Sequence, residues 1–279
     1  MEATIQYIEK ELAGLYPKTE IKAFVRLILE HVFGLSYTDQ VLQRRKKADE
    51  PLRKSVVEVV ERLKAFEPIQ YILGETEFFG MKLKVNPAVL IPRPETEELI
   101  SWILEQRTEG NPTVLDVGTG SGCIALALKK SFKGAEVWAV DFSQQALQIA
   151  RENGRKNSLD VNFFQADILS WENYEWRNFS LIVSNPPYVR ESEKGVMSDN
   201  VLKYEPETAL FVPDSDPLLF YRRIAEFAQR HLEENGWLYF EINEAFGNET
   251  HRLLENAGFC SVETKHDLSG KARMIRCRK

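Results

Sequence analysis

The feature that most limits the possible folds is a regular alternation of short strand-like runs with longer helix-like segments, which begins near Thr113. The strand-like runs are apolar and rich in β-branched residues, and the segments between them have helical periodicity. The expected strands are 113–117, 136–140, 161–165, 181–184 and 237–242, and the expected helices are 123–131, 144–157, 217–233 and 247–256. Such alternation predicts an α/β fold with a mostly parallel sheet and helices on both faces.

The last two expected strands, 261–265 and 273–276, lie close together in the sequence. Ser269 and Gly270 stand between them, and these residues favour a turn. The two strands are therefore expected to pair antiparallel, which is not the pattern of a plain dinucleotide-binding fold.

Residues 1–75 have a different pattern, in which apolar side chains recur at helical spacing. Ile21, Phe24, Val25 and Ile28 follow this spacing, and Gly34 is a stop signal after them. The region contains no catalytic grouping, so it predicts a small helical domain that recognises a partner. Residues 76–92, in which apolar side chains alternate with lysines, are expected to form a β-hairpin linker to a catalytic domain at 93–279.

Composition excludes several classes of function. The 279 residues carry a net charge of −6, which argues against broad non-specific binding to nucleic acid. The one basic run, 44–47, is more typical of a solvated helix face or loop than of a docking patch, which remains the alternative. Three cysteines and four histidines form no ligand-spaced cluster, and neither a membrane span nor a secretory signal is evident. The chain is expected to be cytoplasmic and to bind no metal.

A glycine-rich loop follows the first strand of the alternating region, in the sequence L-D-V-G-T-G-S-G-C. Gly118, Gly120 and Gly122 permit a tight turn and close approach of a ligand to the backbone, and Thr119 and Ser121 lie between them. The third glycine comes one residue too early for the NAD fingerprint, and the Lys-Ser/Thr ending of a P-loop is absent. A purely structural turn remains the alternative for this loop.

Three successive strands end in an acidic residue, and the carboxyl ends of parallel strands meet at one edge of the sheet. Asp116 lies in the first strand, Asp141 ends the second, 23 residues after Gly118, and Asp167 ends the third. A carboxylate at Asp141 can accept both hydroxyls of a ribose, and Asp167 can receive an adenine amino group with Ile168 packed on the ring. Each acid alone could be a helix cap, but the set predicts a nucleoside cofactor site.

The fourth strand ends in S-N-P-P-Y, an unusual sequence for a buried edge. The side-chain oxygen of Asn185 can accept one N–H of a planar amide, and the carbonyl of Pro186 can accept the other. Two such acceptors would hold an NH₂ group, with Pro187 stiffening the turn and Tyr188 packed over the planar group. The alternative is a stiff turn with a tyrosine packed over it.

The N-P-P-Y motif is shared by methyltransferases that modify adenine, guanine or glutamine, so other residues must decide between these substrates. Nearly the whole chain resembles the peptide chain release factor N5-glutamine methyltransferases. The matching stretches are E-P-I-Q-Y-I-L-G-E-T-E-F-F-G (67–80), V-L-I-P-R-P-E-T-E-E-L (89–99), L-D-V-G-T-G-S-G-C-I-A-L-A-L (115–128), S-N-P-P-Y (184–188), Y-E-P-E-T-A-L (204–210), F-Y-R-R-I (220–224) and D-L-S-G-K-A-R (267–273). I-P-R-P-E-T-E is the most specific of these.

The resemblance implies a class I S-adenosylmethionine-dependent methyltransferase with a Rossmann-like, mostly parallel seven-stranded sheet. The implied substrate is the glutamine of the Gly-Gly-Gln motif in class 1 release factors, which the N-terminal helices would dock. Direct binding of nucleic acid is not expected. By position, the cofactor residues are Gly118, Thr119, Gly120, Ser121, Gly122, Asp141, Asp167, Ile168 and Asn185. The glutamine would be bound by Asn185, Pro186, Pro187 and Tyr188, with Asn185 and Pro186 as the catalytic pair.

The loop with Arg93, Pro94 and Glu95 is implied to help close the site, although a rigid lead into a helix fits the same residues. The chain departs from the family at V-P-D-S-D-P (212–217) and at Asn243, where a glycine is common. These departures bear on loop shape rather than on the reaction. Two other interpretations remain: a related enzyme acting on a ribosomal-protein glutamine or a nucleic-acid base, and a non-catalytic cofactor-binding protein.

Overall fold

The computed structural model describes residues 1–36, 38–39, 50–105 and 111–279. These residues form two compact units, one of residues 1–75 with 198–204 and the other of residues 76–197 with 205–279. The basic run 44–47 lies outside the described residues, so its role stays a prediction.

The first unit is helical, as residues 1–75 predict. Its helices are α1 (Glu2–Leu12), α2 (Lys18–Phe33), α4 (Glu50–Lys64), α5 (Ile69–Leu73) and α9 (Asp199–Tyr204). Ile8, Ile28 and Leu63 are fully buried in one shared core, as expected for amphipathic helices that bury their apolar stripes against one another. Helix α2 ends at Gly34, whose φ of 63° is left-handed, so the predicted stop is confirmed.

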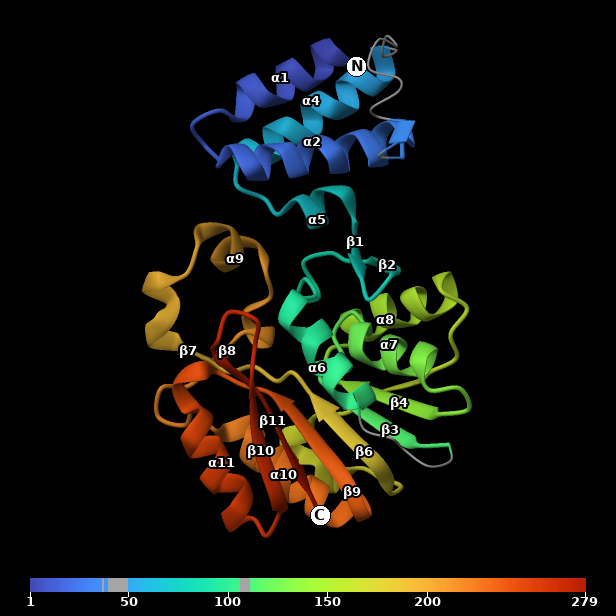
Figure 1. The fold of residues 1–279 in the computed structure, drawn as a ribbon, viewed down its shortest axis with the longest axis vertical. Helices are drawn as coiled ribbons and strands as arrows, with labels where there is room; N and C mark the ends of the chain where they lie inside the picture. The colour runs from blue at the N-terminus through green and yellow to red at the C-terminus, as the bar shows by residue number, and fades with distance from the viewer. Residues whose placement is uncertain (37, 40–49, 106–110) are drawn as a thin grey trace. The chain divides into compact units, whose positions relative to one another are not determined.

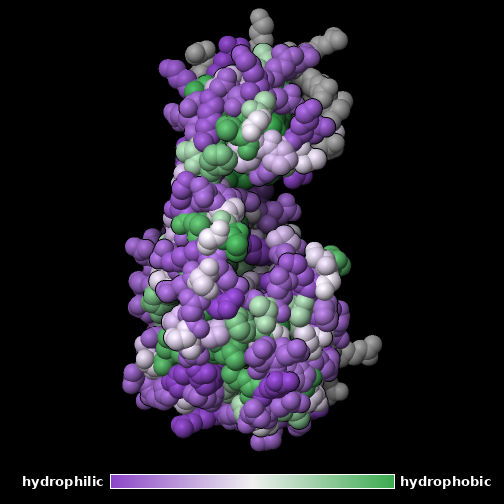
Figure 2. All heavy atoms as spheres, turned by 90° about the vertical axis from the view of Figure 1, so that its left-hand side faces the viewer, coloured by the Kyte–Doolittle hydropathy of each residue, from purple (hydrophilic) through white to green (hydrophobic). Residues whose placement is uncertain are grey.

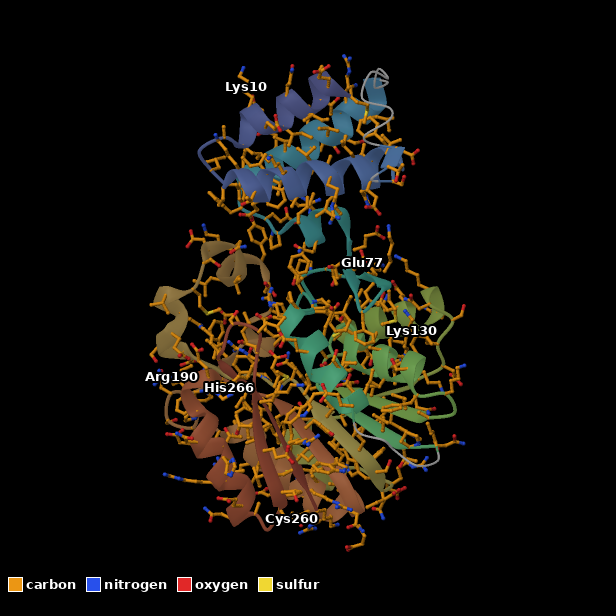
Figure 3. All side chains as sticks on the ribbon, in the orientation of Figure 1. Lys10, Glu77, Lys130, Arg190, Cys260 and His266 are labelled. Atoms are coloured by element: carbon orange, nitrogen blue, oxygen red, sulfur yellow. The ribbon has the colours of Figure 1, made fainter. Side chains whose placement is uncertain are left out.

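The second unit begins with a hairpin of β1 (Glu75–Phe78) and β2 (Met81–Lys84). Phe79 and Gly80 between the strands both have positive φ, the backbone that a tight two-residue hairpin turn needs. Lys130, an exposed residue of α7 (Cys123–Ser131) that is labelled in Figure 3, donates hydrogen bonds to the carbonyls of both residues, at 3.3 and 3.1 Å. These two bonds hold the hairpin turn against α7.

A seven-stranded sheet forms the centre of this unit (Figure 1). Its strands are β3 (Thr113–Val117), β4 (Glu136–Asp141), β5 (Asn162–Gln165), β6 (Phe179–Ser184), β9 (Leu232–Glu241), β10 (Cys260–His266) and β11 (Ala272–Arg278). They lie in the order β10-β11-β9-β6-β3-β4-β5. Neighbours from β9 to β5 pair parallel, whereas β10 and β11 pair antiparallel. The predicted α/β fold and its antiparallel ending are confirmed.

Helices cover both faces of the sheet. They are α6 (Pro94–Glu105), α7 (Cys123–Ser131), α8 (Gln144–Lys156), α10 (Leu219–His231) and α11 (Gly247–Asn256). Adjacent strand residues point to opposite faces. Accordingly, Val114 packs in the core with α6 and α7, and Leu115 packs in the core with α10 and α11. Two apolar layers therefore hold the strands in place from either side.

Two short parallel strands, β7 (Val189–Arg190) and β8 (Phe211–Val212), pair outside the main sheet. The residues around them include the unusual V-P-D-S-D-P segment. There, Asp214 accepts hydrogen bonds from the backbone and the hydroxyl of Ser192. This substitute for a glycine-rich segment is thus an ordered turn tied to a neighbouring loop.

One boundary prediction was wrong. The expected helix 217–233 ends at His231, and Leu232 already has extended backbone and pairs with Phe179. Strand β9 therefore starts five residues before the predicted start at Trp237, and it passes through Asn235, whose φ is 65°. The Asn235-Gly236 pair is typical of a turn, and here it interrupts the regular hydrogen bonding of a strand. The apolar periodicity of the sequence does not reveal such an irregularity.

The face of the molecule in Figure 2 is mostly hydrophilic, with hydrophobic side chains in small groups, as a chain with 28% charged residues predicts. None of the described helices is long and apolar enough to cross a membrane. Within the described ranges, no group of three or more histidine, cysteine or acidic residues could hold a metal ion.

Candidate active site

A cavity lies at the carboxyl ends of β3, β4 and β6, next to the point where the strand order reverses. Ligands of open parallel sheets bind at this position. The cavity is lined by residues 88–90, 92, 93, 96, 117–121, 123, 124, 140–143, 146, 166–168, 184–187, 206, 208, 209, 220 and 224. It therefore brings together nearly all the residues that the sequence nominated.

The glycine loop forms one wall of this cavity. Gly118 and Gly120 have φ of 74° and 53°, and a Cβ added to either would meet no atom within 4 Å. The backbone N–H groups of Gly118 and Thr119 both donate to the carbonyl of Val140, at 2.9 Å. The loop is thus fastened to β4 while its glycines leave open space beside the backbone.

Asp141 holds the same loop from the end of β4. Its carboxylate accepts hydrogen bonds from the backbone N–H groups of Gly120 and Ser143, both at 2.9 Å. Burial raises the pKa of Asp141, and these two hydrogen bonds oppose that rise. Each carboxylate oxygen keeps a further lone pair for a ligand hydroxyl.

Asp116 is fully buried, and it braces the loop instead of lining the cavity. One of its oxygens accepts from the hydroxyl of Thr119 at 2.6 Å and from the backbone of Ala125 at 3.1 Å. Burial raises the pKa of Asp116 to about 7. The first acid of the series therefore stabilises the loop and the start of α7.

Asp167 and Ile168 form the opposite side of the cavity, after β5. One oxygen of Asp167 accepts from the backbone of Leu169 at 2.9 Å and caps a short 3₁₀ helix, Ile168–Asn173. Asp167 is therefore a helix cap and also a lining residue. The two interpretations of this acid are compatible, because a carboxylate has a second oxygen for a ligand.

Asn185 lines the cavity at the end of β6, and its amide is held from behind. Its Nδ2 donates to the hydroxyl oxygen of Thr96 at 3.3 Å. That hydroxyl in turn donates to Oε2 of Glu241 at 2.7 Å. The side-chain oxygen of Asn185 is the atom left to accept a hydrogen bond from a ligand.

Tyr188 is turned toward Glu241. Its hydroxyl donates to Oε1 of Glu241 at 3.0 Å, and its own carbonyl accepts from Nδ2 of Asn243 at 3.0 Å. Burial raises the pKa of Tyr188 well above its ordinary value. Tyr188 is not one of the described residues that line the cavity. Its packing over a substrate amide therefore stays a prediction. Asn243, one departure from the family, contacts the N-P-P-Y segment directly.

Glu241 ends β9 and is 1% exposed. Burial raises its pKa, whereas the hydrogen bonds from Thr96 and Tyr188 and the charge of Arg273 lower it. A buried carboxylate is stable only when its oxygens are paired. Here the partners are Tyr188, the last residue of the N-P-P-Y turn, and Thr96, which is hydrogen-bonded to its first residue, Asn185.

The loop before α6 contributes Pro92 and Arg93 to the lining, and the first turn of α6 contributes Thr96, whereas Pro94 and Glu95 lie outside the lining. Arg93 donates to Glu205 at 2.7 Å, and the other oxygen of Glu205 accepts from the backbone of Ile91 at 3.2 Å. The ion pair thus joins the I-P-R-P-E-T-E loop to the Y-E-P-E-T-A-L segment. Both stretches form walls of one cavity.

The sequence patterns gave no role to Thr96, Glu205 and Glu241. Thr96 and Glu205 lie in stretches that match the family, and Glu241 lies in the expected strand 237–242. Glu241 could have been found from the sequence, because it is a charged residue inside the apolar run L-Y-F-E-I. Such a residue needs a buried partner. Gly122 was nominated for the cofactor but does not line the cavity. It caps α7 with a φ of 83°, and a Cβ added there would lie 3.1 Å from the Cβ of Ala150 in α8.

The residues present fit a nucleoside with an attached aliphatic chain. The open glycine loop accepts close approach, Asp141 offers acceptors for a ribose, and Ile168 and Phe142 offer apolar surface for a base. Together with the sheet order and the antiparallel ending, this site defines a class I S-adenosylmethionine-dependent methyltransferase.

Comparison with known proteins narrows the class. The family models described as PrmC N-terminal domain and Methyltransferase small domain match residues 3–74 and 96–205. A release factor glutamine methyltransferase of Flavobacterium psychrophilum is 47% identical over 95% of this chain and 94% of its own length. One of Bacteroides thetaiotaomicron is 42% identical over 99% of both chains. The chain belongs to the release factor glutamine methyltransferase family.

A solved structure supports the fold alone. A methyltransferase from Pyrococcus furiosus aligns with a TM-score of 0.53 and 19% identity, covering 83% of this chain and 99% of its own.

Proposed function

We propose that this protein transfers a methyl group from S-adenosylmethionine to the side-chain nitrogen of the glutamine in the Gly-Gly-Gln motif of class 1 release factors. The observation that carries the proposal is the orientation of Asn185. Its Nδ2 is engaged by Thr96, which leaves its oxygen to accept an N–H inside the cavity. Family membership supports a glutamine amide as the group that supplies this N–H.

The cofactor would occupy the end of the cavity formed by the glycine loop. Gly118, Gly120 and their neighbours allow its amino-acid part to approach the backbone. The Asp141 carboxylate would accept the ribose hydroxyls, and Asp167 with Ile168 would receive the adenine. When bound, S-adenosylmethionine supplies an electrophilic methyl group on a positively charged sulfur.

The glutamine amide would occupy the Asn185 end. An amide nitrogen is a poor nucleophile because its lone pair is delocalised into the carbonyl. Asn185 Oδ1 and the carbonyl of Pro186 would each accept one N–H, which favours the charge that develops on the nitrogen and aims it at the methyl group. Positioning of this kind lowers a barrier by about 7–11 kcal/mol, so no dedicated base is needed and a proton can leave to water.

Docking of the release factor is assigned to the N-terminal part of the helical unit, residues 1–75, without α9. The described residues of this part show no catalytic grouping, and they share a core of their own, as expected for a recognition module. Deleting residues 1–75 should raise KM for intact release factor while leaving S-adenosylmethionine affinity within a few fold. An unchanged KM in a folded truncation contradicts this assignment. A cytoplasmic location is also proposed, since the substrate acts in translation.

Mass spectrometry of release factor after incubation with the protein and S-adenosylmethionine tests the function. The expected result is one methyl group, located by fragmentation on the side-chain nitrogen of the Gly-Gly-Gln glutamine. A release factor with asparagine in place of that glutamine is the matched control and should stay unmodified. Methylation of the control, or of ribosomal protein or RNA in preference to release factor, contradicts the proposal.

A further inference from the structure

Glu241 connects the two ends of the N-P-P-Y turn through a short chain of hydrogen bonds. One oxygen accepts from Thr96, and the other accepts from Tyr188, at 2.7 and 3.0 Å. Thr96 is 2% exposed and Glu241 is 1% exposed, so water does not compete for these bonds. The partners come from α6, β9 and the end of β6, which are far apart in the sequence.

The direction of each hydrogen bond follows from the number of hydrogens that each group can donate. When Glu241 is ionised its oxygens can only accept, so the single hydrogen of the Thr96 hydroxyl is given to Glu241. The Thr96 oxygen can then only accept from Asn185. The Asn185 atom that faces Thr96 must therefore be its NH₂ group, and the oxygen of the same amide must face the other way.

We propose that Glu241 and Thr96 are positioning residues for methyl transfer, and that they act by fixing which end of the Asn185 amide faces the cavity. The proposal rests on the function proposed above, in which Asn185 Oδ1 accepts an N–H of the substrate glutamine. An asparagine amide has nearly the same shape in both orientations, so shape alone does not choose between them. The flipped orientation would present NH₂ to the NH₂ of the substrate, and a donor cannot hold a donor.

The test compares two replacements of Thr96. Thr96→Val keeps the shape of the side chain but removes the hydroxyl, whereas Thr96→Ser keeps the hydroxyl but removes a methyl group. If the hydroxyl sets the amide, the single-turnover rate should fall about 10–100-fold in Thr96→Val, the usual loss for a partner that orients an active-site group. Thr96→Ser should lose less. If Thr96 only fills space, the order reverses.

A matched control removes a buried threonine hydroxyl elsewhere. Thr250 is fully buried in α11 and donates to the carbonyl of Phe246 at 2.8 Å, outside the cavity lining. Thr250→Val should lower the melting temperature without the loss of rate. Equal rate losses in Thr96→Val and Thr250→Val would assign the effect to general destabilisation and overturn the proposal.

A double-mutant cycle with Asn185→Ala shows whether Thr96 acts through Asn185. The expected result is that Thr96→Val lowers the rate in the parent but changes it less than about 2-fold when Asn185 is already alanine. Full additivity overturns the proposal. If Thr96→Val does not fold, Glu241→Gln takes its place in the cycle, since one end of a glutamine amide is a donor and cannot accept both hydroxyl hydrogens.

The same cycle separates the two proposals. If Asn185→Ala methylates release factor as fast as the parent, the amide clamp fails and this inference fails with it. If Asn185→Ala is slow and Thr96→Val and Glu241→Gln are not, the clamp stands and only the positioning role is overturned. S-adenosylmethionine affinity, measured by calorimetry, should stay within a few fold in every variant.

Discussion

At the glycine-loop end of the cavity the backbone sets the geometry, whereas at the Asn185 end side chains from distant elements set it. Gly118 and Thr119 are held by a carbonyl of the neighbouring strand, and Asp141 closes the loop through backbone N–H groups. Asn185 is instead held by Thr96, which depends on Glu241. The first arrangement is local, and the second requires the whole sheet to be assembled.

This difference suggests a division of labour between binding and catalysis. Substitutions at the glycine loop should mainly change cofactor affinity and stability, because they alter a surface that binds the ground state. Substitutions at the Asn185 end should mainly change the rate, because they alter contacts that strengthen as charge develops on the nitrogen.

The largest effect is expected for Asn185→Ala. Loss of one preorganised contact to the transition state should lower the single-turnover rate about 10²–10³-fold, with cofactor affinity nearly unchanged. Asn185→Asp sharpens the test, since it keeps an acceptor but cannot donate to Thr96, and its rate should lie between those of the parent and Asn185→Ala. A rate loss that merely follows a lower melting temperature would contradict the clamp.

Asp141→Ala should have the opposite profile. Removing the carboxylate releases the backbone of Gly120 and Ser143 and would also delete the hydrogen bonds that we propose it makes to the ribose. We expect S-adenosylmethionine binding to weaken by about 2–4 kcal/mol, measured by calorimetry. At saturating cofactor the methylation rate should recover substantially. Unchanged affinity, or a preference for NAD, would remove Asp141 from the cofactor site.

A pair of glycine substitutions probes the backbone end alone. Gly118→Ala and Gly122→Ala both force alanine into left-handed backbone, which costs about 1–2 kcal/mol. The added Cβ at Gly122 would also lie 3.1 Å from the Cβ and 3.3 Å from the Cα of Ala150, whereas the one at Gly118 meets nothing within 4 Å. Chemical denaturation should therefore find Gly122→Ala the less stable. Equal stabilities would mean that α8 moves away freely.

The last effect concerns Asp116 and depends on pH. Burial raises its pKa from 3.8 to about 7 in the folded protein. Between these values the folded state binds more protons than the unfolded state, so the contribution of Asp116 to stability is lost as the pH rises through about 7. On going from about pH 5 to about pH 8, the parent should lose stability relative to Asp116→Asn. A constant difference between the two would show that Asp116 is ionised throughout.

The two ends of the cavity also differ in how far sequence predicts them. The glycine loop could be predicted because its elements are adjacent in sequence: a buried strand, then Gly118, Thr119 and Gly120, then a helix beginning at Cys123. Strand order supplied the rest, since parallel strands bring Asp141 and Asp167 to the same edge.

The support of Asn185 could not be predicted in this way. Thr96 is 89 residues from Asn185, and Glu241 is 145 residues from Thr96, and no periodicity links such positions. The ion pair of Arg93 with Glu205 could not be predicted either, because its partners are 112 residues apart. Sequence patterns predict elements and their edges, but side-chain contacts between distant elements require coordinates.

The most direct measurement is a crystal structure of the protein with S-adenosylhomocysteine and a peptide that contains Gly-Gly-Gln. We expect the glutamine nitrogen to lie within about 2.7–3.2 Å of both Asn185 Oδ1 and the carbonyl of Pro186, while Asn185 Nδ2 stays hydrogen-bonded to Thr96. The cofactor product should lie along the glycine loop with its ribose on Asp141. A glutamine nitrogen away from Asn185, or an Asn185 oxygen turned to Thr96, would contradict it.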